Sequence, residues 1–97
     1  MSAVESEVYL VLMEYDEQYE RLKKHSEKGS TAELEKYVSN KHDMLLENTL
    51  EAGSYQKRFS WVIIDGFVVE MSSHQAEMLR SAEGVRVVEK DKELKPP

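Results

Sequence analysis

The side chains best suited to do chemistry in this 97-residue sequence are its three histidines. His25, His42 and His74 lie far apart, and none has a second candidate ligand at the short spacing that metal sites use. The sequence contains no Cys, which removes thiolate ligands, thiol nucleophiles and disulfides. We therefore expect neither a metal site nor a cofactor.

One of these histidines is followed by a carboxylate, His42-Asp43, in a segment that predicts a helix. Adjacent residues on a helix point about 100° apart, so the two side chains do not face one another as an acid/base pair would. The simpler interpretation is a histidine at a helix edge, packed beside Leu45 and Leu46. No Ser lies in a nucleophile-elbow motif, and no Gly-rich loop precedes a helix. We predict that the chain is not an enzyme.

Two carboxylates near the end of the sequence, Glu89 and Asp91, are two residues apart. On a strand, both project from the same face as Val87. In one interpretation, they are charges that discourage edge-to-edge pairing of a sheet. In the other, they accept hydrogen bonds from the exposed N–H groups at the ends of a partner's helices. The spacing alone favours the first interpretation, and both stay open at this point.

The first half of the chain predicts a strand, a loop and a long helix. The apolar run Val8–Tyr15 is rich in strand formers, whereas Asp16–Gly29 is mostly charged and favours a surface loop over a loose helical turn. From Ser30 or Thr31 to Ala52 the pattern becomes helical, with Thr31 as a candidate cap and Gly53 as the end. The apolar stripe of this predicted helix consists of Leu34, Val38, Leu45, Thr49 and Ala52.

The second half predicts a hairpin, a short helix and a last strand. Strands at Tyr55–Ile64 and Phe67–Met71 flank Asp65-Gly66, a pair typical of a type I′ turn. Ser72-x-x-Gln75 is a capping box, which opens a helix that Gly84 ends. The last strand is Val85–Asp91. The structural core is predicted to contain Leu45, Phe67, Val69, Met71, Leu79 and Val88.

This order of elements, βαββαβ, predicts an α+β fold of the ferredoxin-like type: a four-stranded antiparallel sheet with two helices on one face. The other face is left bare. Because Val8–Tyr15 is apolar on both faces of the strand, an apolar surface stays uncovered. An exposed apolar sheet face in a chain with 33% charged residues indicates a protein partner.

The net charge of −6 opposes binding to nucleic acid and to anionic membrane surfaces. Gly66-Phe67-Val68-Val69 faintly resembles the aromatic signature of RNA-recognition modules, but Asp65 and Val69 occupy the positions of its basic and second aromatic residues. An RNA-recognition-like module and a dimeric sheet-face interaction module are the alternatives. We expect no nucleic acid, no membrane and a monomer when the chain is free.

Four motifs carry a resemblance to a known family: Asp65-Gly-Phe-Val-Val, Gln75-Ala-Glu-Met-Leu, Gly84-Val and Val88-Glu-Lys-Asp91. In this order they resemble the inhibitory propeptide domain of subtilisin-like serine peptidases. Lys41-His-Asp-Met-Leu-Leu46 and Gly53-Ser-Tyr55 further resemble the plant branch of that family. Asp65 stands where the family pattern has Asn, and Glu83 where it has Pro.

The resemblance implies an inhibitor and folding chaperone of a subtilisin-like peptidase, either its own catalytic domain or a related one. Residues 1–7 would be a flexible lead and 8–91 the inhibitor domain, whose open sheet face docks on two helices of the peptidase. Glu89 and Asp91 would cap those helices, beside Val87. The C-terminal tail would enter the active-site cleft, and its residues are Lys92, Glu93, Leu94, Lys95, Pro96 and Pro97.

The sequence from Met1 to Glu7 lacks the basic and apolar regions of a signal peptide, and no apolar run is long enough to span a membrane. The resemblance nevertheless implies a precursor in the secretory pathway or outside the cell, with its signal absent from this chain. It leaves open whether the chain is an excised propeptide or a stand-alone inhibitor.

Overall fold

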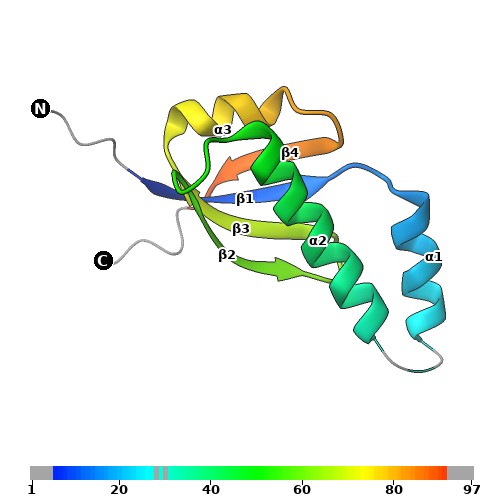
Figure 1. Ribbon diagram of the computed structural model, residues 1–97. Coiled ribbons are helices and arrows are strands. Elements are labelled where there is room, and N and C mark those ends of the chain that lie inside the picture. The colour runs from blue at the N-terminus through cyan, green and yellow to red at the C-terminus, as the bar shows by residue number, and fades with distance from the viewer. Residues whose placement is uncertain (1–5, 28, 30, 92–97) are drawn as a thin grey trace, which may run out of the picture.

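The computed structural model describes residues 6–27, 29 and 31–91. Its strands form one sheet in the order β2-β3-β1-β4, and every neighbouring pair is antiparallel (Figure 1). The predicted α+β, ferredoxin-like fold is confirmed, with one helix more than predicted. In chain order, the elements are β1 (Glu7–Met13), α1 (Glu17–Ser26), α2 (Ala32–Thr49), β2 (Gln56–Trp61), β3 (Gly66–Met71), α3 (Ser73–Arg80) and β4 (Val85–Lys90).

The additional helix is α1, and the prediction of a surface loop over Asp16–Gly29 was wrong. Asp16 caps the helix, because its side chain accepts hydrogen bonds from the backbone N–H groups of Gln18 and Tyr19. Acidic residues occupy the first turn and basic residues the last, as the helix dipole favours. Tyr19 is buried in a small cluster with Leu34 and Val38 of α2. One buried aromatic and a good cap therefore suffice to order a segment that is otherwise charged.

Helix α2 forms where predicted but buries a different stripe. Leu34 and Val38 are buried as expected, and the stripe then continues through His42 and Leu46 at the same four-residue spacing. Leu45 is only partly buried against the core, and Ala52 is exposed beyond the helix end. Thr31 precedes the helix without a side-chain capping hydrogen bond.

The hairpin between β2 and β3 also differs from its prediction. Strand β2 ends at Trp61, Gly66 already belongs to β3 opposite Trp61, and the loop comprises residues 62–65. A type I′ turn needs a positive φ at both of its central residues, and here only Asp65 has one, of 48°. The prediction of a two-residue type I′ turn was therefore wrong. Gly66 instead serves a close approach between strands: a Cβ there would lie 2.8 Å from Leu12 Cδ2 and 3.0 Å from the Val11 carbonyl oxygen.

The main core lies between the sheet and helices α2 and α3. Phe67, Val69, Met71 and Leu79 are fully buried there, and Val88 is 5% exposed. Helix α3 begins with the predicted capping box, in which Ser72 and Gln75 bond reciprocally, and Gly84 follows the helix with φ 89°. Helix α1 packs beside α2, beyond the end of the sheet (Figure 1). No helix in the described part of the chain is long and apolar enough to cross a bilayer.

Candidate functional site

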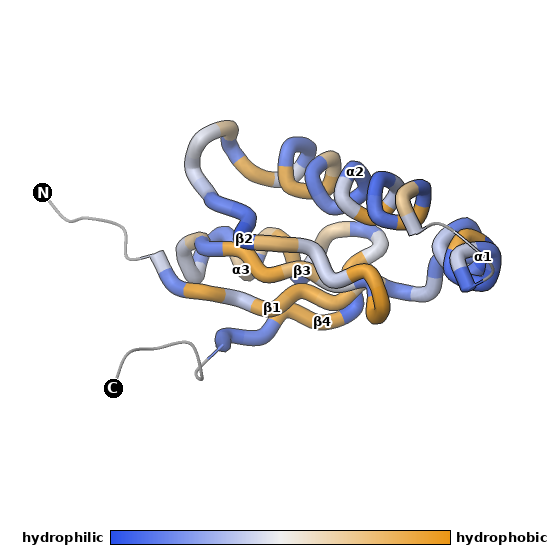
Figure 2. The backbone as a smooth tube through the Cα atoms, turned by 90° about the horizontal axis from the view of Figure 1, so that it is seen from below, coloured by the Kyte–Doolittle hydropathy of each residue, from blue (hydrophilic) through white to orange (hydrophobic). Residues whose placement is uncertain are grey.

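The sheet has one face without a helix over it, on the side opposite α2 (Figure 2). Strand register aligns its side chains in two rows across the strands. One row is Phe59, Val68, Leu10 and Glu89, and the next is Trp61, Gly66, Leu12 and Val87. We call these eight residues the open face. The bare and mostly apolar sheet face that the sequence predicts is therefore present.

The β2 edge of the open face is aromatic. The rings of Phe59 and Trp61 meet edge to face with centroids 5.3 Å apart, a favourable geometry for two aromatic side chains. Phe59 is 43% exposed although it is large and apolar. Gly66 lets the side chains of its own row pack closely, since a Cβ there would meet Leu12 and Trp61. The result is an ordered apolar surface with an aromatic rim.

The β4 edge of the open face is acidic. The Glu89 side chain is exposed and makes no hydrogen bond or ion pair with another described residue. Val87 is half-buried opposite Leu12, and the backbone N–H of Asp91 donates to the Val8 carbonyl at 2.8 Å. Strand alternation thus places Val87, Glu89 and Asp91 on one face. The predicted tail, Lys92 to Pro97, lies outside the described residues.

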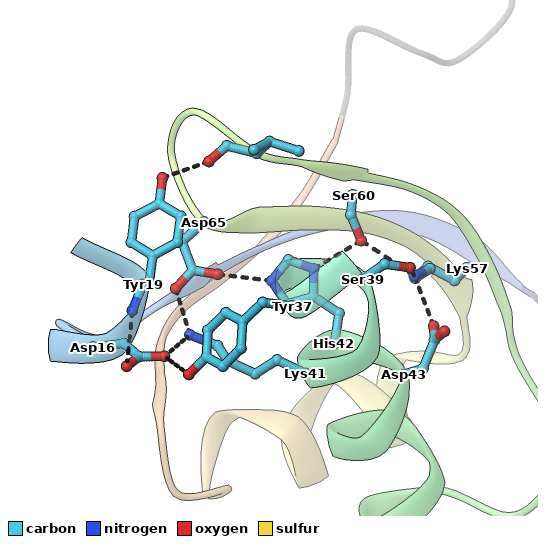
Figure 3. A network of polar contacts seen from close by, with 11 residues as sticks. Asp16, Tyr19, Tyr37, Ser39, Lys41, His42, Asp43, Lys57, Ser60 and Asp65 are labelled. Atoms are coloured by element: carbon cyan, nitrogen blue, oxygen red, sulfur yellow. Dashed lines mark hydrogen bonds and ion pairs between the residues drawn. The ribbon is translucent and has the colours of Figure 1, made fainter. Parts of the chain in front are cut away.

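The opposite side of the β2–β3 hairpin carries a buried polar network (Figure 3). His42 is fully buried, with Nε2 2.8 Å from Asp65 Oδ1 and Nδ1 2.8 Å from Ser60 Oγ. Lys57 Nζ lies 3.2 Å from the same Ser60 hydroxyl and forms an ion pair with Asp43 at 2.7 Å. These contacts fit a neutral His42 that donates from Nε2 and accepts from Ser60.

A second part of the network connects the start of α1 to α2 and the hairpin. Lys41 Nζ lies 2.5 Å from Asp65 Oδ2 and 2.8 Å from Asp16 Oδ2, and so bridges two carboxylates. The Tyr37 hydroxyl donates to Asp16 at 2.7 Å. The Tyr19 hydroxyl donates to the Val62 carbonyl at 2.5 Å. The hairpin is therefore held by side chains from both α1 and α2.

Proton affinities in this network follow from burial and from these contacts. Burial lowers the pKa of His42, although the hydrogen bond to Asp65 acts in the opposite direction. Burial alone would raise the pKa of Asp65, but hydrogen bonds from His42 and Lys41 lower it overall. Burial likewise opposes the shift at Asp16, yet hydrogen bonds from Lys41 and Tyr37 bring its pKa to about 2. The lowered pKa values keep Asp16 and Asp65 as carboxylates and His42 as an uncharged imidazole at neutral pH.

The network has a structural role in the hairpin. The side chains of His42 and Asp65 are 0% and 6% exposed, so no substrate reaches them. The prediction that His42 does not face Asp43 agrees with the structure, since Asp43 pairs with Lys57. The prediction of a helix-edge position for His42 was wrong, because its ring lies in the buried stripe, 4.7 Å from that of Phe67. The spacing of four residues from Val38 was the signal for this burial.

Elsewhere, the described residues offer little for catalysis. His25 and His74 are exposed and separate, and no described group of three His, Cys, Asp or Glu side chains is arranged to hold a metal ion. A groove of about 860 Å³ lies on the helix side, between the ends of α2 and α3, with Glu14, Leu45 and Met78 in its wall. No His, Ser or Cys is among the described residues that line it.

Comparison with known proteins identifies relatives. The chain is 37% identical to the subtilisin-like protease SBT2.5 of Arabidopsis thaliana over 107 residues, which cover 92% of the chain and 13% of the relative. It is 46% identical to subtilisin-like protease SBT2.6 of the same plant over 57 residues, which cover 58% of the chain and 7% of that relative. The chain thus spans a small fraction of the length of these proteins. No solved structure matches it.

A family model adds the decisive match. The model described as peptidase inhibitor I9 covers residues 8–96, nearly the whole chain. The resemblance to the propeptide domain of plant subtilisin-like peptidases is thereby confirmed, and the domain is an inhibitor domain rather than a catalytic one. The chain belongs to the peptidase inhibitor I9 family.

Proposed function

We propose that this chain inhibits a subtilisin-like serine peptidase by docking its open face on the catalytic domain. The observation that carries the proposal is the open face itself, an ordered apolar surface with an exposed carboxylate at one edge. Exposed apolar surface of this kind marks a protein interaction site. The relatives, which are named as subtilisin-like proteases, point to the partner.

The acidic edge provides the polar part of this docking. The first four N–H groups of a helix have no partner within the helix, and the helix dipole favours a negative charge there. The Glu89 side chain makes no hydrogen bond or ion pair with another described residue, so its carboxylate can accept from such groups without giving up a bond to the described part of the chain. Asp91 follows it two residues later at the same edge. Together they are expected to cap helices of the peptidase.

The tail then blocks the active site. Lys92 to Pro97 continue directly from Asp91, so docking by the two carboxylates places the start of the tail beside the peptidase. We propose that the tail occupies the cleft as a cleaved product would, without an acyl group to transfer. The same docking surface would help the catalytic domain to fold, in a precursor that enters the secretory pathway or leaves the cell.

The RNA-binding alternative loses its main support in the structure. Its signature needs Phe67 on the open face, and this side chain is fully buried in the core. A dimer formed through the open face is the remaining alternative. Light scattering of the free chain at increasing concentration would detect it.

Titration against a panel of peptidases tests the proposal. The chain is expected to inhibit subtilisin-like peptidases competitively and to leave trypsin-like and cysteine peptidases active, because sheet docking requires the surface helices of one fold. Inhibition of all three classes alike, or of none, would contradict the proposal.

A further inference from the structure

The hairpin tip, Val62, Ile63 and Ile64, is a second apolar surface that the open face does not include. Ile63 is 75% exposed and Ile64 is 53% exposed, high values for such apolar side chains. Val62 turns the other way and packs on the cluster around Tyr19. Two consecutive isoleucines that are both exposed to water indicate a contact with an apolar surface of a partner.

The residues on either side hold the tip in place. The Val62 carbonyl accepts a hydrogen bond from the Tyr19 hydroxyl. The Asp65 carbonyl accepts from the backbone N–H of Met13 at 3.1 Å, and the Asp65 side chain is fixed by Lys41 and His42. The two isoleucines are thus presented by a preorganised loop. A preorganised loop loses little conformational entropy on binding, which is an advantage at an interface.

The tip is continuous with the open face and lies at the end of the sheet away from Asp91. Trp61 belongs to the open face and directly precedes the tip. The row that contains Trp61 crosses β1 at Leu12, whereas Asp91 bonds to Val8. Four residues of strand separate those two positions, about 13 Å. Asp91, the last described residue, and the tip therefore lie at opposite ends of the sheet (Figure 1).

The two ends of the sheet differ in the side chains that the hairpin and β4 present. At the end where β4 finishes are the exposed Glu89, the half-buried Asp91, and the half-buried Glu70, which is paired with Arg58 at 2.7 Å. At the tip end the hairpin exposes Ile63 and Ile64, and the exposed Glu14 and Tyr15 follow β1 at the same end of the sheet. A partner that covers the whole length must offer hydrogen-bond donors at one end and an apolar patch at the other.

We propose that the hairpin tip is an anchoring site for the catalytic domain of the same peptidase, on an apolar patch outside the active-site cleft. This inference rests on the proposed function. The occupant follows from continuity: a rigid partner seated on the rows of Phe59 and Trp61 extends over the residues that follow Trp61. The tip contributes affinity and fixes the orientation of docking, while the tail alone blocks the cleft.

The test is inhibition of the catalytic domain of SBT2.5 by the full chain and by the double variant Ile63→Ser, Ile64→Ser. The inhibition constant of the variant is expected to rise at least about ten-fold, which corresponds to ~1.4 kcal/mol. Inhibition at saturation should stay complete, because the tail is intact. Met44→Ser is the matched control, since Met44 is 60% exposed on α2, on the other side of the sheet. The inhibition constant of this variant should equal that of the parent chain.

The outcomes separate this inference from the proposed function. If the parent chain inhibits and the double variant matches it within about two-fold, the tip is not an anchor, although docking by the open face stands. If the parent chain does not inhibit the peptidase, the proposed function fails first. If the parent is a dimer in light scattering and the double variant a monomer of unchanged inhibition constant, the tip binds a second copy, which also overturns the inference. Each single variant is measured as well, in case the double variant loses its native circular dichroism.

Discussion

His42 and Asp65 join two elements that are far apart in the sequence: Nε2 of His42 on α2 lies 2.8 Å from Oδ1 of Asp65 in the β2–β3 hairpin. Asp65 is also bonded by Lys41, which itself reaches Asp16 at the start of α1. The hairpin that presents the exposed isoleucines is therefore fixed by a buried polar pair. The first prediction concerns the charge state of this pair.

The free energy of unfolding should fall as the pH drops below about 6.5. Unfolded His42 has an ordinary pKa, and the folded pKa is lowered by burial, so below 6.5 the unfolded chain binds more protons than the folded one. Stability is thus present above the unfolded pKa and is lost as the pH falls toward the folded pKa. One such proton changes stability by at most about 1.4 kcal/mol per pH unit. Urea denaturation between pH 5 and 8 measures the slope.

The control for this effect is a second histidine. In His42→Gln, whose amide can still donate to Asp65, the slope between pH 5 and 7 should flatten. In His74→Gln, whose side chain is exposed, the slope of the parent should be kept. Equal slopes in the parent and in His42→Gln would show that the buried imidazole is not the group that titrates.

Phe67→Ala should destabilise the domain by about 3–5 kcal/mol, the usual effect of truncating a buried Phe. Phe67 is fully buried and its ring packs on that of His42, so its removal leaves a cavity beside the polar network. Phe59→Ala is the matched control, because Phe59 is 43% exposed and its loss should be much smaller. Thermal or urea denaturation gives both values. A loss below about 1 kcal/mol for Phe67→Ala would place its ring outside the core.

Gly66→Ala should destabilise the sheet by about 1–3 kcal/mol, the range expected for overpacking. The added methyl group would meet Leu12 Cδ2 at 2.8 Å and the Val11 carbonyl oxygen at 3.0 Å, and the backbone oxygen cannot turn aside as a side chain can. Gly29→Ala is the control, since nothing lies within 4 Å of a Cβ at that position. The two midpoints of urea denaturation are compared. If the two variants had similar midpoints, β1 and β3 would be able to move apart around the added methyl group without an appreciable loss of stability.

Glu89→Ala with Asp91→Ala should weaken inhibition, and Glu89→Ala alone should leave the stability of the free domain within about 0.5 kcal/mol, as is usual for substitutions of exposed side chains. Hydrogen bonds to charged groups contribute about 1.5–3 kcal/mol each, so the inhibition constant should rise at least ~10-fold. Glu35→Ala is the control, because Glu35 is exposed on the helix side. If the double variant inhibits as tightly as the parent, the two carboxylates only discourage edge pairing.

Deleting Lys92 to Pro97 separates docking from blockage. The shortened chain should still bind the catalytic domain through the open face, measured by calorimetry. It should no longer prevent hydrolysis of a small peptide substrate, because nothing fills the cleft. Full inhibition by the shortened chain would disprove the product-like mechanism.

The sequence predicted those elements whose signals are local. The capping box at Ser72 and the positive φ of Gly84 each depend on a few neighbouring residues, and both are present. Helix α1 escaped prediction because its main apolar contact, Tyr19 on Leu34 and Val38, is a tertiary one. The position of Gly66 in the hairpin was missed for the same reason, since the approach of Leu12 is invisible in a local pattern.

In the candidate site, too, the sequence predicts the local features and misses those that depend on tertiary contacts. Alternation along β4 placed Val87 and Glu89 together correctly, because it needs only the period of a strand. The bond between His42 and Asp65 joins residues 23 positions apart, which no spacing rule predicts. The aromatic rim formed by Phe59 and Trp61 requires the register of β2 against β3, which a bulge between Lys57 and Phe59 shifts.

Because of its strand order, the sheet can be completed only late in the synthesis of the chain. The inner strand β1 is made first, but its neighbours are β3 and the very last strand, β4. Until Val85–Lys90 has left the ribosome, β1 has an open edge with unpaired backbone groups. Contacts between residues this far apart also slow folding. A polypeptide that is interrupted before β4 therefore lacks both the acidic edge and a closed sheet, so the proposed docking surface and the completed fold arrive together.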